Sequence, residues 1–259
     1  MKENKIQYAP EELHGLLREF HALYLERPIE DNGGGMKSPH LFNTWHSIKK
    51  LQPKLIIESG VWRGLGTWIL EKAAPEADII SIEIDYSNLI YKSPNVTYLN
   101  QDIKSYNWDA VLSERYPHVS RDEILVFLDD HQNFLHRLEF IHSLGIKHIL
   151  YEDNYPPSQG DTFSPKKILA CEDYVIDQAG HREMYKFSYF DHSTFTEFVK
   201  LYQELPPIFK LDKTRWGDNW QEPKYPTEQP LLSLEEKDTF PVFFEEADSY
   251  TWICYMELS

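Results

Sequence analysis

The chain has 259 residues, of which 41% are hydrophobic and 14% aromatic. This composition predicts a globular domain and excludes a disordered chain. The formal net charge of -16 disfavours nucleic acid and anionic membranes as partners, because like charges repel. No run of about 20 apolar residues occurs, so we expect no membrane-spanning segment.

The N-terminal residues 1–52 are expected to form two helices. Residues 10–26 place apolar side chains on one stripe, and residues 39–51 repeat that pattern. Between them lies Asp31-Asn32-Gly33-Gly34-Gly35, which favours a flexible connection. No apolar segment follows the first residues, and Cys171 and Cys254 lack metal-ligand spacing. We therefore expect no signal peptide and a reducing, cytoplasmic setting.

Five apolar segments alternate with helical segments after residue 53. Strands are expected at 54–59, 78–84, 96–99, 124–128 and 148–151. This alternation predicts an α/β fold with a doubly wound, mostly parallel sheet, in which ligands bind at the carboxyl ends of the strands. Acids occur at the end of every predicted strand: Glu58, Glu83, Asp85, Asp102, Asp129, Asp130, Glu152 and Asp153.

The C-terminal third has a looser pattern. Thr194–Glu197 is a capping box, which predicts a helix that continues through Leu201 and Tyr202. Residues 206–230 are rich in proline and aromatic residues and favour a long loop over the site. Phe240–Phe244 and Tyr250–Leu258 are expected to pair as a closing antiparallel hairpin.

We therefore expect a single domain over residues 1–259. Its parts are the N-terminal helices (1–52), a cofactor-binding core (53–160), a lid or substrate segment (161–235) and the closing strands (236–259).

The first predicted strand runs into a glycine-rich turn with Gly60, Gly64 and Gly66. Glycines let the backbone approach a nucleoside, and an acid on the next strand, here Glu83, binds the ribose hydroxyls. The spacing is G-x-x-x-G-x-G, whereas dinucleotide-binding turns use G-x-G-x-x-G. This difference favours S-adenosylmethionine, which has no pyrophosphate, over NAD.

These segments resemble the class I S-adenosylmethionine-dependent methyltransferases. The resemblance is strongest to the metal-dependent small-molecule and sugar O-methyltransferases of the catechol, caffeoyl-CoA and macrocin types. The matching pieces lie within residues 54–155: Ile57-Glu58-Ser59-Gly60 with Gly64, Ile80–Ile84, Val126–Asp129 and Glu152-Asp153-Asn154.

The resemblance implies a set of site residues. Glu58, Gly60 and Gly64 would contact the methionine part of the cofactor, Glu83 the ribose, and Asp102 the adenine. The resemblance also implies Arg63 and Asp129 as cofactor-binding residues, because they lie in the same motifs. Asp129, Asp153 and Asn154 would bind Mg²⁺ or another divalent cation, which suits their oxygen ligands. Strand alternation leaves open whether Asp129 or its neighbour Asp130 faces the cation.

The implied reaction is methyl transfer to a hydroxyl of a small molecule or sugar. The catechol enzymes place a lysine where this chain has Gln132, so the base must be another group. His131 is the predicted proton acceptor, with Asp130 as the second candidate. Two other readings stay open: an NAD-dependent oxidoreductase and a non-catalytic nucleoside-binding module. We expect no nucleic-acid or membrane partner, and a homo-oligomer is compatible with the sequence.

Overall fold

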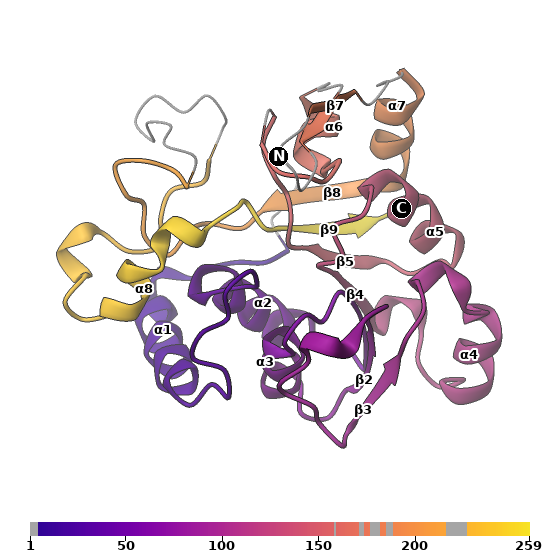
Figure 1. Ribbon diagram of the computed structural model, residues 1–259, viewed down its shortest axis with the longest axis horizontal. Coiled ribbons are helices and arrows are strands. Elements are labelled where there is room, and N and C mark those ends of the chain that lie inside the picture. The colour runs from indigo at the N-terminus through magenta and orange to yellow at the C-terminus, as the bar shows by residue number, and fades with distance from the viewer. Residues whose placement is uncertain (1–4, 158, 171–173, 177–181, 185–188, 216–226) are drawn as a thin grey trace.

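The computed structural model describes residues 5–157, 159–170, 174–176, 182–184, 189–215 and 227–259. Seven strands form one sheet in the order β3-β2-β1-β4-β5-β9-β8 (Figure 1). Five of them are mutually parallel: β1 (Leu55–Ser59), β2 (Asp78–Ile82), β3 (Val96–Leu99), β4 (Ile124–Leu128) and β5 (His148–Tyr151). The last two close the sheet, because β9 (Cys254–Leu258) is antiparallel to both β5 and β8 (Val199–Glu204).

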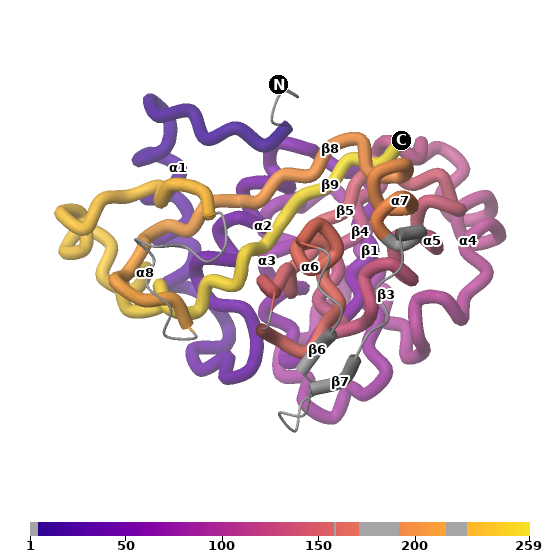
Figure 2. Tube along the Cα trace, turned by 90° about the horizontal axis from the view of Figure 1, so that it is seen from above, coloured from indigo at the N-terminus to yellow at the C-terminus, as the bar shows by residue number. Residues whose placement is uncertain are grey.

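Helices cover both faces of this sheet (Figures 1 and 2). One face carries α1 (Pro10–Leu25), α2 (Ser38–Leu51), α3 (Leu65–Ala73) and α8 (Pro241–Glu245). The other carries α4 (Trp108–Arg115), α5 (Phe134–Ser143), α6 (Pro165–Leu169) and α7 (Tyr189–Phe198). A separate pair, β6 (Tyr174–Ile176) and β7 (Arg182–Met184), is antiparallel. Single 3-10 turns lie at Tyr86–Asn88, Ile103–Ser105, Arg121–Glu123, Leu234–Glu236 and Ala247–Ser249.

Alternation along the strands builds a core on each face of the sheet. Ile56 and Phe127 join the core with α1, α2 and α3, whereas Ile57 and Val126 join the core with α4 and α5. Strands buried on both faces read as continuous apolar runs, which explains why β1 and β4 were recognisable from the sequence.

The chain reverses its winding direction between β1 and β4, which are parallel neighbours. Backbone hydrogen bonds continue just past the ends of these strands, from Asp129 N–H to the Ser59 carbonyl (2.8 Å) and from Glu152 N–H to the Leu128 carbonyl (2.9 Å). The acids after β4 and β5 therefore lie beside the glycine turn after β1, at the edge where doubly wound sheets bind ligands.

The predicted core strands and N-terminal helices are confirmed, but the closing pair differs from the prediction. The partner of β9 is β8, not Phe240–Phe244, which is the helix α8. Pro241 lies in the first turn of α8, where its missing N–H costs nothing.

The predicted helix through Leu201 and Tyr202 is wrong, since α7 ends at Phe198 and β8 follows at once. In β8, Val199, Leu201 and Gln203 are buried while their neighbours are more exposed, which is the period of a strand.

The described parts of the long loop expected at 206–230, residues 206–215 and 227–230, contain no helix or strand. The rest of the lid or substrate segment (161–235) contains α6, β6, β7, α7 and β8. Trp216, Trp220 and Tyr225 lie outside the described residues, as does Cys171. Cys254 is a buried free thiol in β9. Among the described helices, none combines the length and the apolarity that crossing a bilayer requires.

Candidate functional site

Two neighbouring cavities open at the carboxyl ends of β1, β2, β4 and β5. The first, of about 440 Å³, is bordered by the β1 turn, the end of β2 and the segment after β4. Of the predicted cofactor residues, Gly60, Glu83, Asp102 and Asp129 border it. Glu58, Arg63 and Gly64 do not border it. We call it the cofactor cavity.

Glu83 ties the second strand to the glycine turn of the first. One carboxylate oxygen, Oε2, accepts hydrogen bonds from the backbone N–H groups of Val61 (3.1 Å) and Trp62 (3.2 Å). Its carboxylate also borders the cofactor cavity. The acid therefore shapes the turn as well as the cavity, while the contact with a ribose stays a prediction.

The two predicted glycines have steric roles in the backbone. Gly60 has a φ of 96°, and a Cβ there would lie 2.0 Å from the carbonyl oxygen of Asp129. Gly64 has a φ of 93°, and its Cβ would lie 2.3 Å from the carbonyl oxygen of Tyr91. Close backbone approach at a left-handed φ requires glycine at both positions.

Glu58 is buried beneath the glycine turn. Its Oε2 accepts hydrogen bonds from the hydroxyls of Thr67 (2.6 Å) and Ser81 (2.5 Å). Burial raises the pKa of Glu58 to about 7, and those two hydrogen bonds oppose the rise. This carboxylate stabilises the inside of the turn and contacts neither cavity.

Arg137 binds the two acids that follow β3 and β4. Its guanidinium donates to both carboxylate oxygens of Asp102 (3.0 and 2.6 Å) and to Oδ2 of Asp130 (2.9 Å). Asp130 also accepts from the Ser59 hydroxyl at 2.7 Å. Both predicted site acids are thus held in one network by an arginine that is only 4% exposed.

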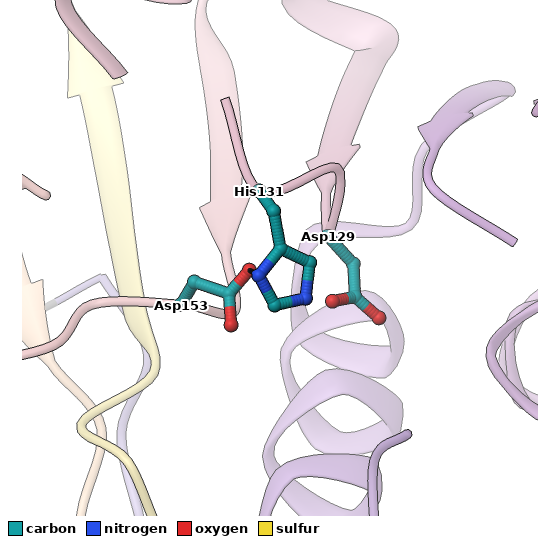
Figure 3. Close-up of side chains that lie close together, drawn as sticks. All are labelled: Asp129, His131 and Asp153. Atoms are coloured by element: carbon teal, nitrogen blue, oxygen red, sulfur yellow. Dashed lines mark ion pairs between the residues drawn. The ribbon is translucent and has the colours of Figure 1, made fainter. Parts of the chain in front are cut away.

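Asp129, His131 and Asp153 form a compact group beside the cofactor cavity (Figure 3). One ligand atom from each lies within 4.8 Å of the others. The imidazole lies between the two carboxylates, with Nδ1 at 3.6 Å from Oδ2 of Asp153. That Asp153 oxygen is buried and has no hydrogen-bond partner among the described residues.

The charges in this group strongly influence one another. Burial, followed by the neighbouring Glu152, raises the pKa of both Asp129 and Asp153 well above the usual value. A hydrogen bond between Nδ1 of His131 and Asp161 (3.1 Å) raises the pKa of His131 to about 10, although burial opposes it. Crowded carboxylates of this kind favour a positive charge between them.

His131 also has an unusual backbone conformation, with a φ of 51°. A non-glycine residue in this left-handed region costs free energy and is found preferentially at functional sites. The turn between β4 and α5 thereby brings the imidazole back toward Asp153.

Asn154, the third predicted metal ligand, faces other partners. Its amide oxygen accepts the backbone N–H of Lys166 (2.9 Å), and its nitrogen donates to the Tyr202 hydroxyl (2.8 Å). Asn154 therefore fastens α6 and β8 to the end of β5. Its role as a ligand stays a prediction, and His131 occupies the third place in the group.

The second cavity, of about 330 Å³, also borders this group. It shares Gly34, Gly35, Asp129 and His131 with the cofactor cavity. Glu152, Asp153, Tyr155 and Thr251 contribute further polar groups to its wall.

The glycine-rich stretch after α1 forms the wall common to the two cavities. The Trp62 indole N–H donates to the carbonyl of Gly33 (3.1 Å), and the Arg63 guanidinium donates to the carbonyl of Asp31 (2.6 Å). The run of three glycines was a visible signal in the sequence, but no pattern there showed that it lies against the β1 turn.

His40 of α2 is a buried residue near the site that the sequence did not reveal. The Thr251 backbone N–H donates to Nε2 of His40 at 2.8 Å, so Nδ1 carries the proton and donates to Glu152 at 2.5 Å. Burial lowers the pKa of His40 to about 3. This contact is therefore a hydrogen bond from a neutral imidazole, although its geometry is that of an ion pair.

Neither a family model nor a curated protein matches the sequence. Solved structures do match. An O-methyltransferase from Bacillus cereus in complex with SAH has 9% identity and a TM-score of 0.43, over 96% of this chain and 90% of that chain. The CmcI apo-structure has 14% identity and a TM-score of 0.41, over 69% of each chain.

A third match is the O-methyltransferase TomG from Streptomyces achromogenes, involved in tomaymycin synthesis, in complex with SAM. It has 15% identity and a TM-score of 0.35, over 59% of this chain and 66% of that chain. Likenesses of such low identity and TM-score say nothing about activity, which has to follow from the geometry of the site.

Proposed function

We propose that this chain is an S-adenosylmethionine-dependent O-methyltransferase that acts on a hydroxyl of a small molecule or sugar with the help of a divalent cation. The observation that carries the proposal is the pair of cavities that meet at Asp129 and His131. Methyl transfer is an in-line displacement, so the donor and the acceptor oxygen must be held side by side. Two adjoining cavities at the switch point of the sheet suit this requirement.

On the cofactor side, Glu83 is the proposed partner of the ribose hydroxyls. Its carboxylate is already oriented by two backbone N–H groups of the β1 turn, so little order has to be created when the nucleoside binds. Asp102, fixed by Arg137, borders the same cavity and is the proposed neighbour of the adenine.

On the acceptor side, the residues fit a divalent cation. Oδ2 of Asp153 is buried without a hydrogen-bond partner in the described part of the chain, and it faces only the Nδ1 of His131 at 3.6 Å among the atoms that this group contributes. Two buried carboxylates, Asp129 and Asp153, are costly unless a cation neutralises them. When bound there, such a cation would lower the pKa of the acceptor hydroxyl. Asp130 is already bound by Arg137 and Ser59, so His131 is the better candidate for the group that contacts the hydroxyl, directly or through the cation.

The test compares ligands for the two cavities by calorimetry. S-adenosylhomocysteine should bind to the purified protein, and NADH should not. Transfer of a labelled methyl group from S-adenosylmethionine to a panel of sugars and phenols should then stop when EDTA is added. Binding of NADH in place of S-adenosylhomocysteine would favour the oxidoreductase, and binding without transfer to any acceptor would favour the non-catalytic module.

A further inference from the structure

We propose that His131 is a ligand of the divalent cation, together with Asp129 and Asp153, and that the site selects a transition-metal dication such as Co²⁺ or Zn²⁺ over Mg²⁺. This inference deepens the proposed function and rests on its metal requirement. It changes the third ligand from the expected amide oxygen of Asn154 to an imidazole nitrogen.

The first argument is the availability of the donor atoms. Both polar atoms of the Asn154 side chain are engaged, by the Lys166 N–H and the Tyr202 hydroxyl. The ligand atoms of Asp129, His131 and Asp153 lie within 4.8 Å of one another, and the Asp153 oxygen is buried without a hydrogen-bond partner. The ring of His131 is therefore the neighbouring donor that can complete the group.

The second argument is the way in which His131 is held. Metal-binding histidines usually donate their other ring N–H to a carboxylate, which fixes the orientation of the ring. Here Nδ1 lies 3.1 Å from Oδ1 of Asp161, which comes from the loop after β5. The other ring nitrogen, Nε2, is turned toward Asp129 (Figure 3). Asp161 thus acts as a positioning residue for the imidazole.

The third argument is the backbone of His131. Its φ of 51° is unfavourable for a side chain that is merely exposed on a turn. The ring lies between the two carboxylates, although 41% of the side chain is exposed.

The donor set determines the metal. Mg²⁺ and Mn²⁺ are suited by oxygen ligands, whereas an imidazole nitrogen suits later dications such as Fe²⁺, Co²⁺ or Zn²⁺, whose affinity for such a site is higher. Two carboxylates and one imidazole therefore form a mixed site, with the remaining coordination positions left for water and the acceptor hydroxyl.

Calorimetry and absorption spectroscopy of the full chain test the inference without any assay of activity. Co²⁺ should bind at least about tenfold more tightly than Mg²⁺, in accord with a nitrogen ligand. Co²⁺ should give visible absorption bands that change in His131→Ala. Asp161→Asn should weaken Mn²⁺ binding by about 10- to 100-fold, the usual effect of removing the partner of a metal-bound histidine.

The matched control is His136→Ala, because His136 is an exposed histidine on α5, outside the acid group. It should leave the Co²⁺ spectrum and the Mn²⁺ affinity unchanged. The affinity for S-adenosylhomocysteine should be the same in Asp161→Asn and His136→Ala as in the wild type, which also shows that these variants are folded. Because His131 borders the cofactor cavity, circular dichroism shows whether His131→Ala is folded.

An unchanged Mn²⁺ affinity and Co²⁺ spectrum in His131→Ala would overturn the inference, as would equal affinities for Mg²⁺ and Co²⁺. Failure of the wild-type protein to bind S-adenosylhomocysteine, with the metal results intact, would instead contradict the proposed function and leave the metal site standing.

Discussion

Gly60 shows how strictly a single position can be determined by backbone packing. The crossing of the β1 turn and the end of β4 leaves no room for a side chain at Gly60, where a Cβ would lie 2.0 Å from the Asp129 carbonyl oxygen. The sequence pattern identified this glycine as important for a ligand. The structure gives it a second reason to be glycine, which no spacing rule contains.

Gly60→Ala should lower the free energy of unfolding by about 3 kcal/mol, because it combines a backbone clash with an unfavourable φ. Urea unfolding measures this. Gly15→Ala is the matched control, since its Cβ would have no heavy atom within 4 Å and it lies inside α1. That variant should be stabilised by up to about 1 kcal/mol. Equal stability of the two variants would contradict the packing argument.

Glu58 should make the stability of the protein depend on pH. Its folded pKa is about 7, against 4.5 for the ordinary group, so the folded state holds a proton that the unfolded state releases between these values. Stability should therefore fall as the pH rises from about 4.5 to about 7, by roughly 3 kcal/mol in total.

Glu58→Gln keeps an oxygen acceptor for the Thr67 and Ser81 hydroxyls and removes the titration. Chemical denaturation at several pH values should show a flatter profile in this variant than in the wild type. His40, whose pKa is lowered to about 3 by burial, contributes in the opposite direction, because stability from a neutral buried histidine is lost as the pH falls below 6.5. The difference between variant and wild type isolates Glu58.

At the scale of elements, the parallel core could be predicted and the closing strands could not. The strands β1 and β4 are buried on both faces and read as apolar runs, so their length identified them, together with the glycine turn that follows β1. In β8, by contrast, the capping box just before the strand, at Thr194–Glu197, predicted a helix. The alternation of buried and exposed residues within β8 was therefore not recognised as that of a strand. The choice between α8 and a strand at residues 240–244 depended on tertiary contacts that periodicity does not carry.

The interactions among polar site residues were equally hidden from the sequence. The strand-end acids could be listed from the pattern, but their partners lie far apart along the chain. Asp102 and Asp130 accept hydrogen bonds from Arg137, and Glu152 accepts one from His40 of α2. Such contacts are set by how helices pack on the sheet, which a single sequence does not reveal.

Arg137 of α5 connects the ends of β3 and β4, and its removal should affect both. Arg137→Met leaves the buried Asp130 without its cation, a loss of about 3 kcal/mol by the usual cost of breaking a buried pair. Thermal and urea unfolding should show the loss, and the affinity for S-adenosylhomocysteine should fall as Asp102 loses its anchor.

Arg18→Met is the control, because Arg18 is exposed on α1 and should be close to neutral. The double variant Arg137→Met with Asp130→Asn should recover part of the stability. No recovery would mean that the arginine acts by its packing instead of its charge.

At the scale of the whole molecule, binding of the cofactor and binding of the cation should be separable. Glu83→Gln should weaken binding of S-adenosylhomocysteine by roughly tenfold, since a charge-assisted hydrogen bond becomes a neutral one. It should leave Mn²⁺ binding unchanged.

Asp153→Ala should weaken Mn²⁺ binding, leave the affinity for S-adenosylhomocysteine unchanged and remove most of the methyl transfer. Calorimetry on both variants measures the two affinities, and a loss of both ligands in either variant would contradict two separate sites.

The loop Asp31–Met36 has a consequence for how the two substrates would affect each other's binding. Gly34 and Gly35 border both cavities, and the loop is hydrogen-bonded to the β1 turn through Trp62 and Arg63. A nucleoside bound against that turn would therefore also hold the loop in place, and the loop forms part of the wall of the cavity proposed to bind the acceptor. Such coupling is reciprocal, so each substrate should raise the affinity for the other. We expect steady-state kinetics in which the KM of each substrate falls as the concentration of the other is raised.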